Sequence, residues 1–220
     1  MIFNLGGGAA TPQLTSIAVT TQPTKMTYNV GDKFSKTGMV VTAYFDDGSS
    51  SVITGYSYSP TSALNMSTKT ITISYTHEGI TKTATVSITM QYVLYNRGTE
   101  HANTGGMAQT HGSKESNRIH VRITGETTAW VYTSNKISLS NCTTLKAIVG
   151  TYDAAETKIN LGIGSSQKSF TAKTSPTVSY VQEQTISLSI SSYASGSYYV
   201  QLSCGLVGVS GWAVYKIWLE

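Results

Sequence analysis

The chain has 220 residues, of which 40% are hydrophobic and only 12% charged, and its formal net charge is +4 at pH 7. Globular proteins usually carry about a quarter of charged residues. Lys and Arg are scattered here and form no basic stripe, so we do not expect a nucleic acid as partner. No apolar run reaches the roughly 18 residues of a membrane span, so we expect no membrane insertion.

The composition favours β structure throughout. Thr, Tyr and Val are frequent and suit the pleated surface of a sheet. No stretch of a dozen residues repeats apolar positions at helical spacing. We therefore expect an all-β protein with two β-sandwich domains, at residues 14–91 and 92–220, preceded by a flexible segment at residues 1–13.

The first segment, MIFNL, is followed directly by three glycines. It has no Lys or Arg and no apolar core of 7–15 residues, so it does not have the form of a secretory signal. The glycines keep it flexible, whereas the residues before them favour burial: Met1, Ile2, Phe3 and Leu5. We expect an assembly tether that adds to the sheet edge of a neighbour or fills a groove. The alternative is an ordinary disordered terminus.

Residues 14–91 contain short alternating strands separated by turns. The first strand passes through Ile17 and Val19. Asp47-Gly48 predicts a two-residue type I′ hairpin, since glycine tolerates positive φ. His77-Glu78-Gly79 predicts a second turn. The core-facing residues on either side of these turns are Val41, Ala43, Phe45, Ile71, Ile73, Tyr75, Ala84, Val86, Ile88 and Met90. Such spacing of strands and turns is typical of a sandwich.

Several marks in this part resemble the group 3 bacterial immunoglobulin-like domain: PTK, YNVGD, GMVVT, DGS and the ending TITISYTHEGITKTATVSITM. The resemblance implies a small sandwich of a kind found in bacterial surface proteins and phage virion proteins. It implies no catalytic residues. The boundary to the next domain is expected near Met90–Tyr92, and QYVLYN continues in strand-like alternation, so no flexible linker is expected.

Residues 92–220 are expected to form a second sandwich of about eight strands, a jelly roll. The predicted strands are Asn117–Ile123, Ala129–Thr133, Lys136–Leu139, Leu145–Tyr152, Lys158–Gly162, Thr185–Ile190, Tyr198–Cys204 and Ala213–Leu219. LYNRGTEHANTGGM, ISLSNCTTLKAIV, SGSYYVQLS and AVYKIWLE are similar to C-terminal modules of phage tail-region proteins. That resemblance implies a galactose-binding-like carbohydrate module.

The loop 97–117 shows little periodicity, and loops of this length are often functional or disordered. It holds His101 and His111, with Glu100 and Glu115 nearby. Their spacing matches no metal signature, so we expect a solvated polar loop with no metal. A calcium ion held by loop oxygens stays open, without a position. No other cofactor is expected.

The sequence contains no nucleophile elbow, HExxH, P-loop or GxGxxG pattern. No pair of carboxylates is singled out for glycoside hydrolysis. We therefore expect no catalytic residues and no enzyme. Cys142 and Cys204 are too few for a disulfide framework, and Cys204 is expected to point into a core.

Exposed aromatic rings are the candidates for sugar contacts. Trp212 follows a Gly-rich turn and is expected to be exposed. Trp130 and Tyr199 are the other two ligand-contact candidates, and the wider set adds Tyr132, Tyr193 and Trp218. The competing interpretation for each ring is core packing.

Together these observations favour a non-enzymatic phage or prophage virion accessory protein on the tail or capsid. It would attach through its N-terminus to other virion proteins or sister subunits and adhere to host-surface glycans. It would be made in the bacterial cytoplasm without a signal peptide and reside in the virion. The alternative is a bacterial surface adhesin or carbohydrate-binding module, and a third interpretation is a tail-associated glycan hydrolase.

Overall fold

The structure is a computed structural model that describes residues 11–121, 128–152, 157–180, 183–205 and 211–220. The expected tether residues Met1, Ile2, Phe3 and Leu5 lie outside this part of the chain. The described chain is built almost entirely of strands, which confirms the all-β class. It divides into two compact units, residues 1–90 and residues 91–220, called here the first and the second unit.

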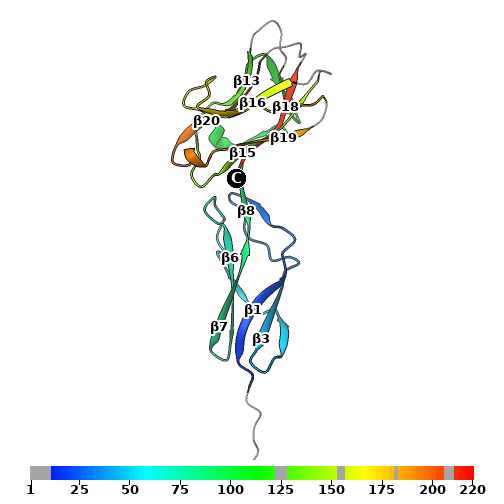
Figure 1. Cartoon of the computed structure of the whole chain (residues 1–220), viewed down its shortest axis with the longest axis vertical. Coiled ribbons are helices and arrows are strands. Elements are labelled where there is room, and N and C mark those ends of the chain that lie inside the picture. Colours follow the sequence, from blue (N-terminus) through cyan, green and yellow to red (C-terminus); the bar gives the residue numbers. More distant parts are fainter. Residues whose placement is uncertain (1–10, 122–127, 153–156, 181–182, 206–210) are drawn as a thin grey trace, which may run out of the picture. The chain divides into compact units, whose positions relative to one another are not determined.

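The first unit has two small sheets around one core. Its strands are β1 (Leu14–Thr21), β2 (Thr27–Asn29), β3 (Val40–Phe45), β4 (Ser50–Ile53), β5 (Ser57–Ser59), β6 (Thr70–His77), β7 (Ile80–Ser87) and the start of β8 (Thr89–Asn96). One sheet has the order β1-β3-β4 and the other β5-β6-β7 (Figure 1). The predicted inward residues Val41, Ala43, Ile71, Ile73 and Val86 are buried in the core between them, as their period of two requires.

The first of the two predicted hairpin turns differs from the expectation. The Phe45 amide donates to the Ser49 carbonyl, the Gly48 amide donates to the Phe45 carbonyl, and Gly48 alone has a positive φ, of 81°. A type I′ turn needs positive φ at both central residues, so the type I′ prediction for Asp47-Gly48 is wrong; the connection is a three-residue loop that ends in a left-handed glycine. The two-residue turn with two positive φ values lies at Glu78 (48°) and Gly79 (77°).

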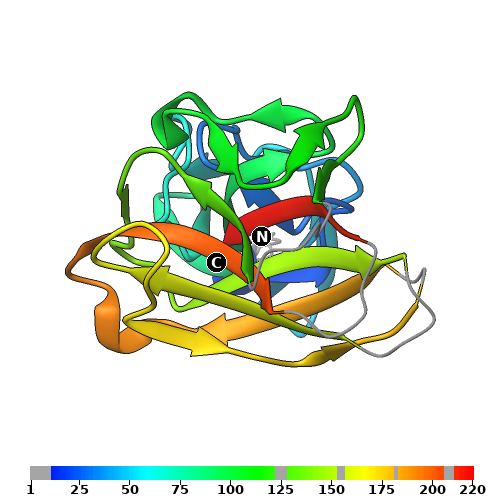
Figure 2. The ribbon, with the colours of Figure 1, turned by 90° about the horizontal axis from the view of Figure 1, so that it is seen from above.

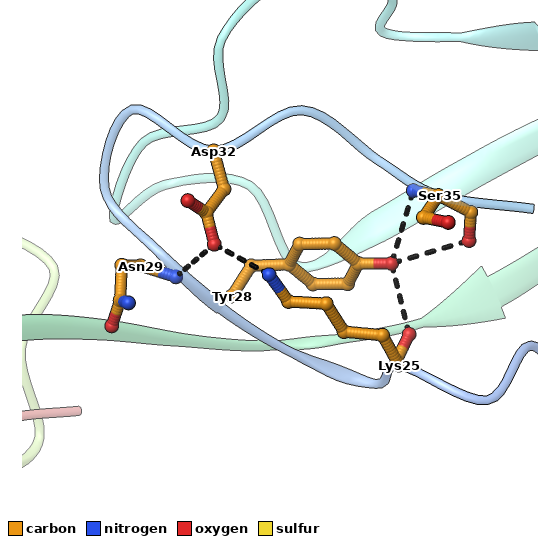
Figure 3. A network of polar contacts seen from close by, with 5 residues as sticks. All are labelled: Lys25, Tyr28, Asn29, Asp32 and Ser35. Atoms are coloured by element: carbon orange, nitrogen blue, oxygen red, sulfur yellow. Dashed lines mark hydrogen bonds and ion pairs between the residues drawn. The ribbon is translucent and has the colours of Figure 1, made fainter.

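The YNVGD mark has a structural role in this unit (Figure 3). The buried Tyr28 hydroxyl accepts from the Ser35 amide at 3.2 Å and lies 2.9 Å from the Lys25 carbonyl oxygen. The Asp32 carboxylate accepts from Lys25 Nζ at 2.8 Å and from the Asn29 amide at 3.0 Å. The Lys25 hydrogen bond lowers the pKa of Asp32. These bonds hold the chain on both sides of the turn that follows β2.

The second unit holds β8 beyond its first two residues and all later elements. They are β9 (Thr99–Glu100), η1 (Ala102–Thr104), β10 (Met107–Gln109), β11 (Gly112–Lys114), β12 (Ile119–Val121), β13 (Thr128–Thr133), β14 (Ile137–Ser138), β15 (Thr144–Thr151), β16 (Thr157–Gly164), β17 (Ala172–Thr174), β18 (Thr177–Val178), β19 (Gln184–Ser189), η2 (Ser191–Tyr193), β20 (Ser197–Gly205) and β21 (Trp212–Leu219).

These strands form two antiparallel sheets. The β13–β20 sheet has the order β10-β13-β20-β16-β17, with β14 paired to β20 and β18 paired to β16. The β15–β21 sheet has the order β11-β12-β21-β15-β19, with β8 paired to β21 and β9 paired to β8. β16 and β20 run side by side without a register shift (Figure 2). An unbroken register keeps alternate residues on the same face of both strands.

The core of the second unit lies between the inner faces of the two sheets. The prediction that Cys204 points inward is confirmed: it is fully buried, and burial raises the pKa of its thiol to about 11. Ile119 and Val121 are buried as predicted, whereas Arg122 and Ile123 of the same predicted strand lie outside the described residues. The loop 97–117 is more ordered than expected, since it contains three short strands and one 3₁₀ turn.

Candidate functional site

The outer face of the β13–β20 sheet is the candidate site. Pairing places Trp130 opposite Ser203, Tyr132 opposite Gln201, and Gly164 opposite Tyr199. Directly opposed residues of antiparallel strands share one face. Ala129, Val131, Leu202 and Cys204 alternate with them and are buried on the inner face. Trp130, Tyr132 and Tyr199 therefore point to the outer side, where each ring is half-buried.

A loop after β16, residues 165–171 and called here the strap, crosses this outer face. Gly162 and Gly164 face outward beneath it, and a Cβ on Gly162 would collide with the ring of Phe170. A Cβ on Gly164 would collide with the Ser169 backbone. The two glycines thus remove the side chains that would keep the strap off the sheet. The sequence LGIGSSQKSF folds back because the strand leaves room for it.

Gln201 fastens the strap to the sheet. Its side chain is fully buried. The amide nitrogen donates to the carbonyls of Ser166 (3.1 Å) and Ser169 (2.5 Å), and the amide oxygen accepts from the Lys168 backbone at 2.7 Å. A buried amide with all these partners satisfied is a strong positional constraint. Gln201 therefore fixes where the strap displays its outward side chains.

The strap adds a fourth ring to the three that the strands supply. Phe170 lies beside Trp130, with ring centroids 5.1 Å apart and ring planes inclined by 32°. Lys168 Nζ lies 6.0 Å from the centroid of Tyr132. Trp130, Tyr132, Phe170 and Tyr199 are called here the aromatic face.

Polar groups lie between the rings of the aromatic face. Ser203 on β20 lies between Trp130 on β13 and Asn160 on β16. The Asn160 amide nitrogen donates to Ser203 Oγ at 2.9 Å. The Ser175 hydroxyl donates to the Asn160 amide oxygen at 2.5 Å. The surface therefore combines aromatic carbon with the oriented amide of Asn160, whereas Ser203 is buried.

A pocket with a volume of about 680 Å³ lies at the end of this surface. Ser197 is on β20 with the same parity as Ser203, Gln201 and Tyr199, so it belongs to the outer face and also lines the pocket. Lys136 lines the pocket and lies over the Tyr199 ring, 5.7 Å from its centroid. The pocket thus lies beside the Tyr199 end of the aromatic face.

The pocket is lined mainly by polar side chains: Tyr92, Asn103, Asn135, Lys136, Ser138 and Ser197. The Asn103 amide donates to the Tyr92 hydroxyl at 2.7 Å, and that hydroxyl lies 3.3 Å from His101 Nδ1. His101 Nδ1 also accepts from the Asn103 backbone amide at 3.2 Å, so the imidazole orients both residues. Burial raises the pKa of the Tyr92 hydroxyl. The pocket offers donors and acceptors in fixed positions.

Two of the three predicted ligand-contact residues, Trp130 and Tyr199, lie on the aromatic face. The expectation that Trp212 is exposed is wrong, because its side chain is fully buried. Trp212 begins β21 opposite Val121 and Thr151 of the two flanking strands, and since both of these residues are buried, all three side chains lie on the inner face, in the core. Trp218 is also buried, with 7% of its surface exposed.

Both glutamates considered for a metal are in ion pairs. Glu100 pairs with Lys114 at 2.7 Å, and Glu115 pairs with Arg118 at 2.6 Å and with His120 at 3.2 Å. Among the described residues, no group of three or more His, Cys, Asp or Glu side chains could hold a metal ion. In the same part of the chain, no helix has the length and hydropathy that a bilayer crossing needs.

Sequence reasoning did not identify Phe170, Gln201, Asn160 or the pocket residues. Gln201 and Asn160 occupy outward positions of strands in which polar and apolar residues alternate. At such a position a polar residue indicates only that the side chain faces solvent. The one usable signal was the pair of glycines in LGIG, since glycine inside a strand marks a close backbone approach.

These features define a modular all-β protein composed of two β-sandwich units. Residues 21–89 match the family model of the bacterial Ig-like domain (group 3), which confirms the resemblance of the first unit. No curated protein matches the chain at the significance required. The resemblance of residues 92–220 to phage tail-region modules is not confirmed.

Several solved structures that are similar to the chain are carbohydrate-binding modules or complexes with an oligosaccharide. The family 11 carbohydrate-binding module of Clostridium thermocellum, in complex with a β-1,3-1,4-mixed-linked tetrasaccharide, is 13% identical; the match covers 52% of this chain and 81% of that one, with a TM-score of 0.35. A structure of carbohydrate-binding modules from the β-sandwich superfamily is 11% identical, with 95% and 100% covered and a TM-score of 0.36. SGBP-B of Bacteroides ovatus, in complex with a mixed-linkage heptasaccharide, is 11% identical, with 90% and 52% covered and a TM-score of 0.31. At these identities and TM-scores the likeness is remote and transfers no ligand to this chain.

Proposed function

We propose that the second unit binds carbohydrate, without catalysis, along the aromatic face and into the adjoining pocket. The observation that carries the proposal is the placement of four half-buried rings on one sheet face, beside a pocket lined by amide, hydroxyl and ammonium groups. Aromatic rings present apolar surface together with an oriented quadrupole, which suits the C–H faces of a sugar. Amide and hydroxyl groups suit its hydroxyls, because they both donate and accept.

The preorganisation of the surface supports the same function. Gln201 holds the strap, and Asn160 is bonded on both sides, so little ordering is left to be done when a ligand binds. The polar network of the first unit has a structural role, since it holds the turn that follows β2, and the rings of Phe45, Tyr75 and His77 in this unit pack against one another. We therefore assign it the role of a spacer.

Location on a virion is a separate proposal, which rests on the sequence resemblance and on the N-terminal segment outside the described residues. The alternative location is a bacterial surface. Carbohydrate binding by the second unit is compatible with both locations.

Affinity electrophoresis of the full chain in gels that contain mixed-linkage β-glucan, arabinoxylan or polygalacturonate tests the proposed function. We expect at least one polymer to retard the protein. Trp130→Ala should weaken that retardation about tenfold, the equivalent of about 1.4 kcal/mol for one lost aromatic contact. Tyr44→Ala is the matched control, since Tyr44 is an aromatic residue of the first unit and is 37% exposed. Unchanged binding by Trp130→Ala, or no binding to any polymer, would overturn the proposal.

A further inference from the structure

Among the described residues of the second unit, the carboxylates belong to one of the two sheets. Each of its four described carboxylates is in an ion pair: Glu100 with Lys114, Glu115 with Arg118, Glu183 with Arg97 and Glu220 with Lys146, all at 2.6 or 2.7 Å. All four belong to the β15–β21 sheet or to the residues that flank its strands. In the described residues, no carboxylate lies on the aromatic face.

Four exposed lysines on or beside the aromatic face form no ion pair with any carboxylate that the structure describes. Lys136, Lys168 and Lys173 lie over the rings of Tyr199, Tyr132 and Phe170, with Nζ 5.7, 6.0 and 5.5 Å from the ring centroids. The fourth, Lys158, precedes Asn160 by two residues on β16 and so faces the same side. Their ammonium groups surround a surface that contains no negative charge among the described residues.

We infer that the carbohydrate bound by the aromatic face is an anionic glycan, a polymer that carries phosphate or carboxylate groups; this inference rests on the proposed function. Ammonium groups on long stems pair with such anions at variable positions along a chain. In the unliganded protein the rings stabilise the ammonium groups, so the lysines are held near the surface. A neutral glycan would leave all four positive charges without a partner.

Single-stranded nucleic acid also uses rings and cations, but it needs ring faces on which successive bases stack. Here three of the rings carry an ammonium group, and Trp130 packs against Phe170. The amide of Asn160 and the hydroxyl and amide groups of the pocket favour a ligand rich in hydroxyls. The observations therefore favour a glycan over a nucleic acid.

The test compares binding of the full chain to polygalacturonate, poly(glycerol phosphate), neutral mixed-linkage β-glucan and oligo(dT). The test variant replaces Lys136, Lys158, Lys168 and Lys173 by Gln. The matched control replaces four lysines of the first unit by Gln, namely Lys33, Lys36, Lys69 and Lys82. Both variants lower the formal net charge from +4 to zero, so they differ only in where the charge is removed.

We expect at least one of the two anionic polymers to bind, and raised salt to weaken its binding. One exposed ion pair is worth up to about a fivefold change in affinity, so the test variant should bind that polymer about tenfold more weakly or worse. The first-unit control should bind like the unmodified chain. Arginine at the same four positions should restore binding, which separates loss of charge from damage to the fold.

Each of the other possible binding results contradicts one of the two proposals. Equal binding of the neutral glucan and the anionic polymers, unaffected by the lysine changes, overturns the anionic preference but leaves the proposed function standing. No binding to any of the three glycans overturns both. If oligo(dT) binds more tightly than every glycan, the proposal of a glycan ligand is wrong and a nucleic acid is the better candidate.

Discussion

Replacement of Gln201 by Met should detach the strap from the sheet. Methionine has a similar length and volume but forms none of the three hydrogen bonds that the Gln201 amide makes to the strap backbone. An intramolecular hydrogen bond contributes about 0.5–1.5 kcal/mol, so three amount to about 3 kcal/mol. If the strap opens to water, its backbone groups are solvated again and the loss is smaller, about 2 kcal/mol.

All three tryptophans of the chain, at positions 130, 212 and 218, belong to the second unit. Tryptophan fluorescence during urea unfolding therefore reports the second unit alone. We expect the Gln201→Met transition to move to lower urea by the amount that corresponds to 2–3 kcal/mol. Hydrogen exchange of the Lys168 amide should accelerate strongly, because that amide donates to Gln201.

Ser203→Ala provides the control. Ser203 lies two residues from Gln201 on the same face and loses one hydrogen bond, from Asn160. It should cost only about 1 kcal/mol and leave the Lys168 amide protected. If Gln201→Met behaves like Ser203→Ala in both measurements, Gln201 is not the residue that fastens the strap, and the argument for a preorganised surface is refuted.

Three further outcomes are expected. Trp212→Ala should lower the free energy of unfolding of the second unit by about 3–5 kcal/mol, because removal of a buried ring leaves a cavity. Trp130→Ala should lower it by only about 1 kcal/mol. Circular dichroism during urea unfolding would measure both values, and equal losses would contradict the burial argument. The pKa of Asp32 is lowered, so the contribution of this carboxylate to the stability of the first unit is complete above the ordinary pKa of 3.8 and is lost as the pH falls further. Asp32→Asn should therefore destabilise the first unit at neutral pH by about 1 kcal/mol. The difference should vanish in acid, and NMR signals of the first unit would measure it. Removal of residues 1–12 should abolish self-association in light scattering and co-sedimentation with particles of the producing strain; if both proteins are monomers that ignore particles, the tether hypothesis fails.

The strands could be predicted from the sequence because alternation is a local property. Ile119 and Val121, or Ile71 and Ile73, occupy alternate positions, and each pair is buried on one face as predicted. Trp212 shows the limit of such reasoning. The glycines beside it suggested an exposed turn, but its burial is decided by Val121 and Thr151, which lie about 90 and 60 positions away and become its neighbours only through strand pairing.

The candidate site was predictable only in part, for a related reason. Trp130 and Tyr199 could be proposed because rings on a polar face are noticeable in isolation. The role of Gln201 exists only because residues 165–171 fold across the sheet above it. A polar residue in an alternating strand looks the same whether water or another loop covers it, so neither composition nor periodicity could distinguish the two.

The strap divides its work between residues that anchor it and residues that it displays. Gly162, Gly164 and Gln201 hold the backbone, the Phe170 ring packs over Gly162 and beside Trp130, and the Lys168 side chain is exposed. Changes at the displayed positions leave the anchors intact, so this loop can be resculpted for another ligand while the sandwich below stays the same. The second unit is in this respect a scaffold with an exchangeable recognition loop, and its specificity can diverge faster than its fold.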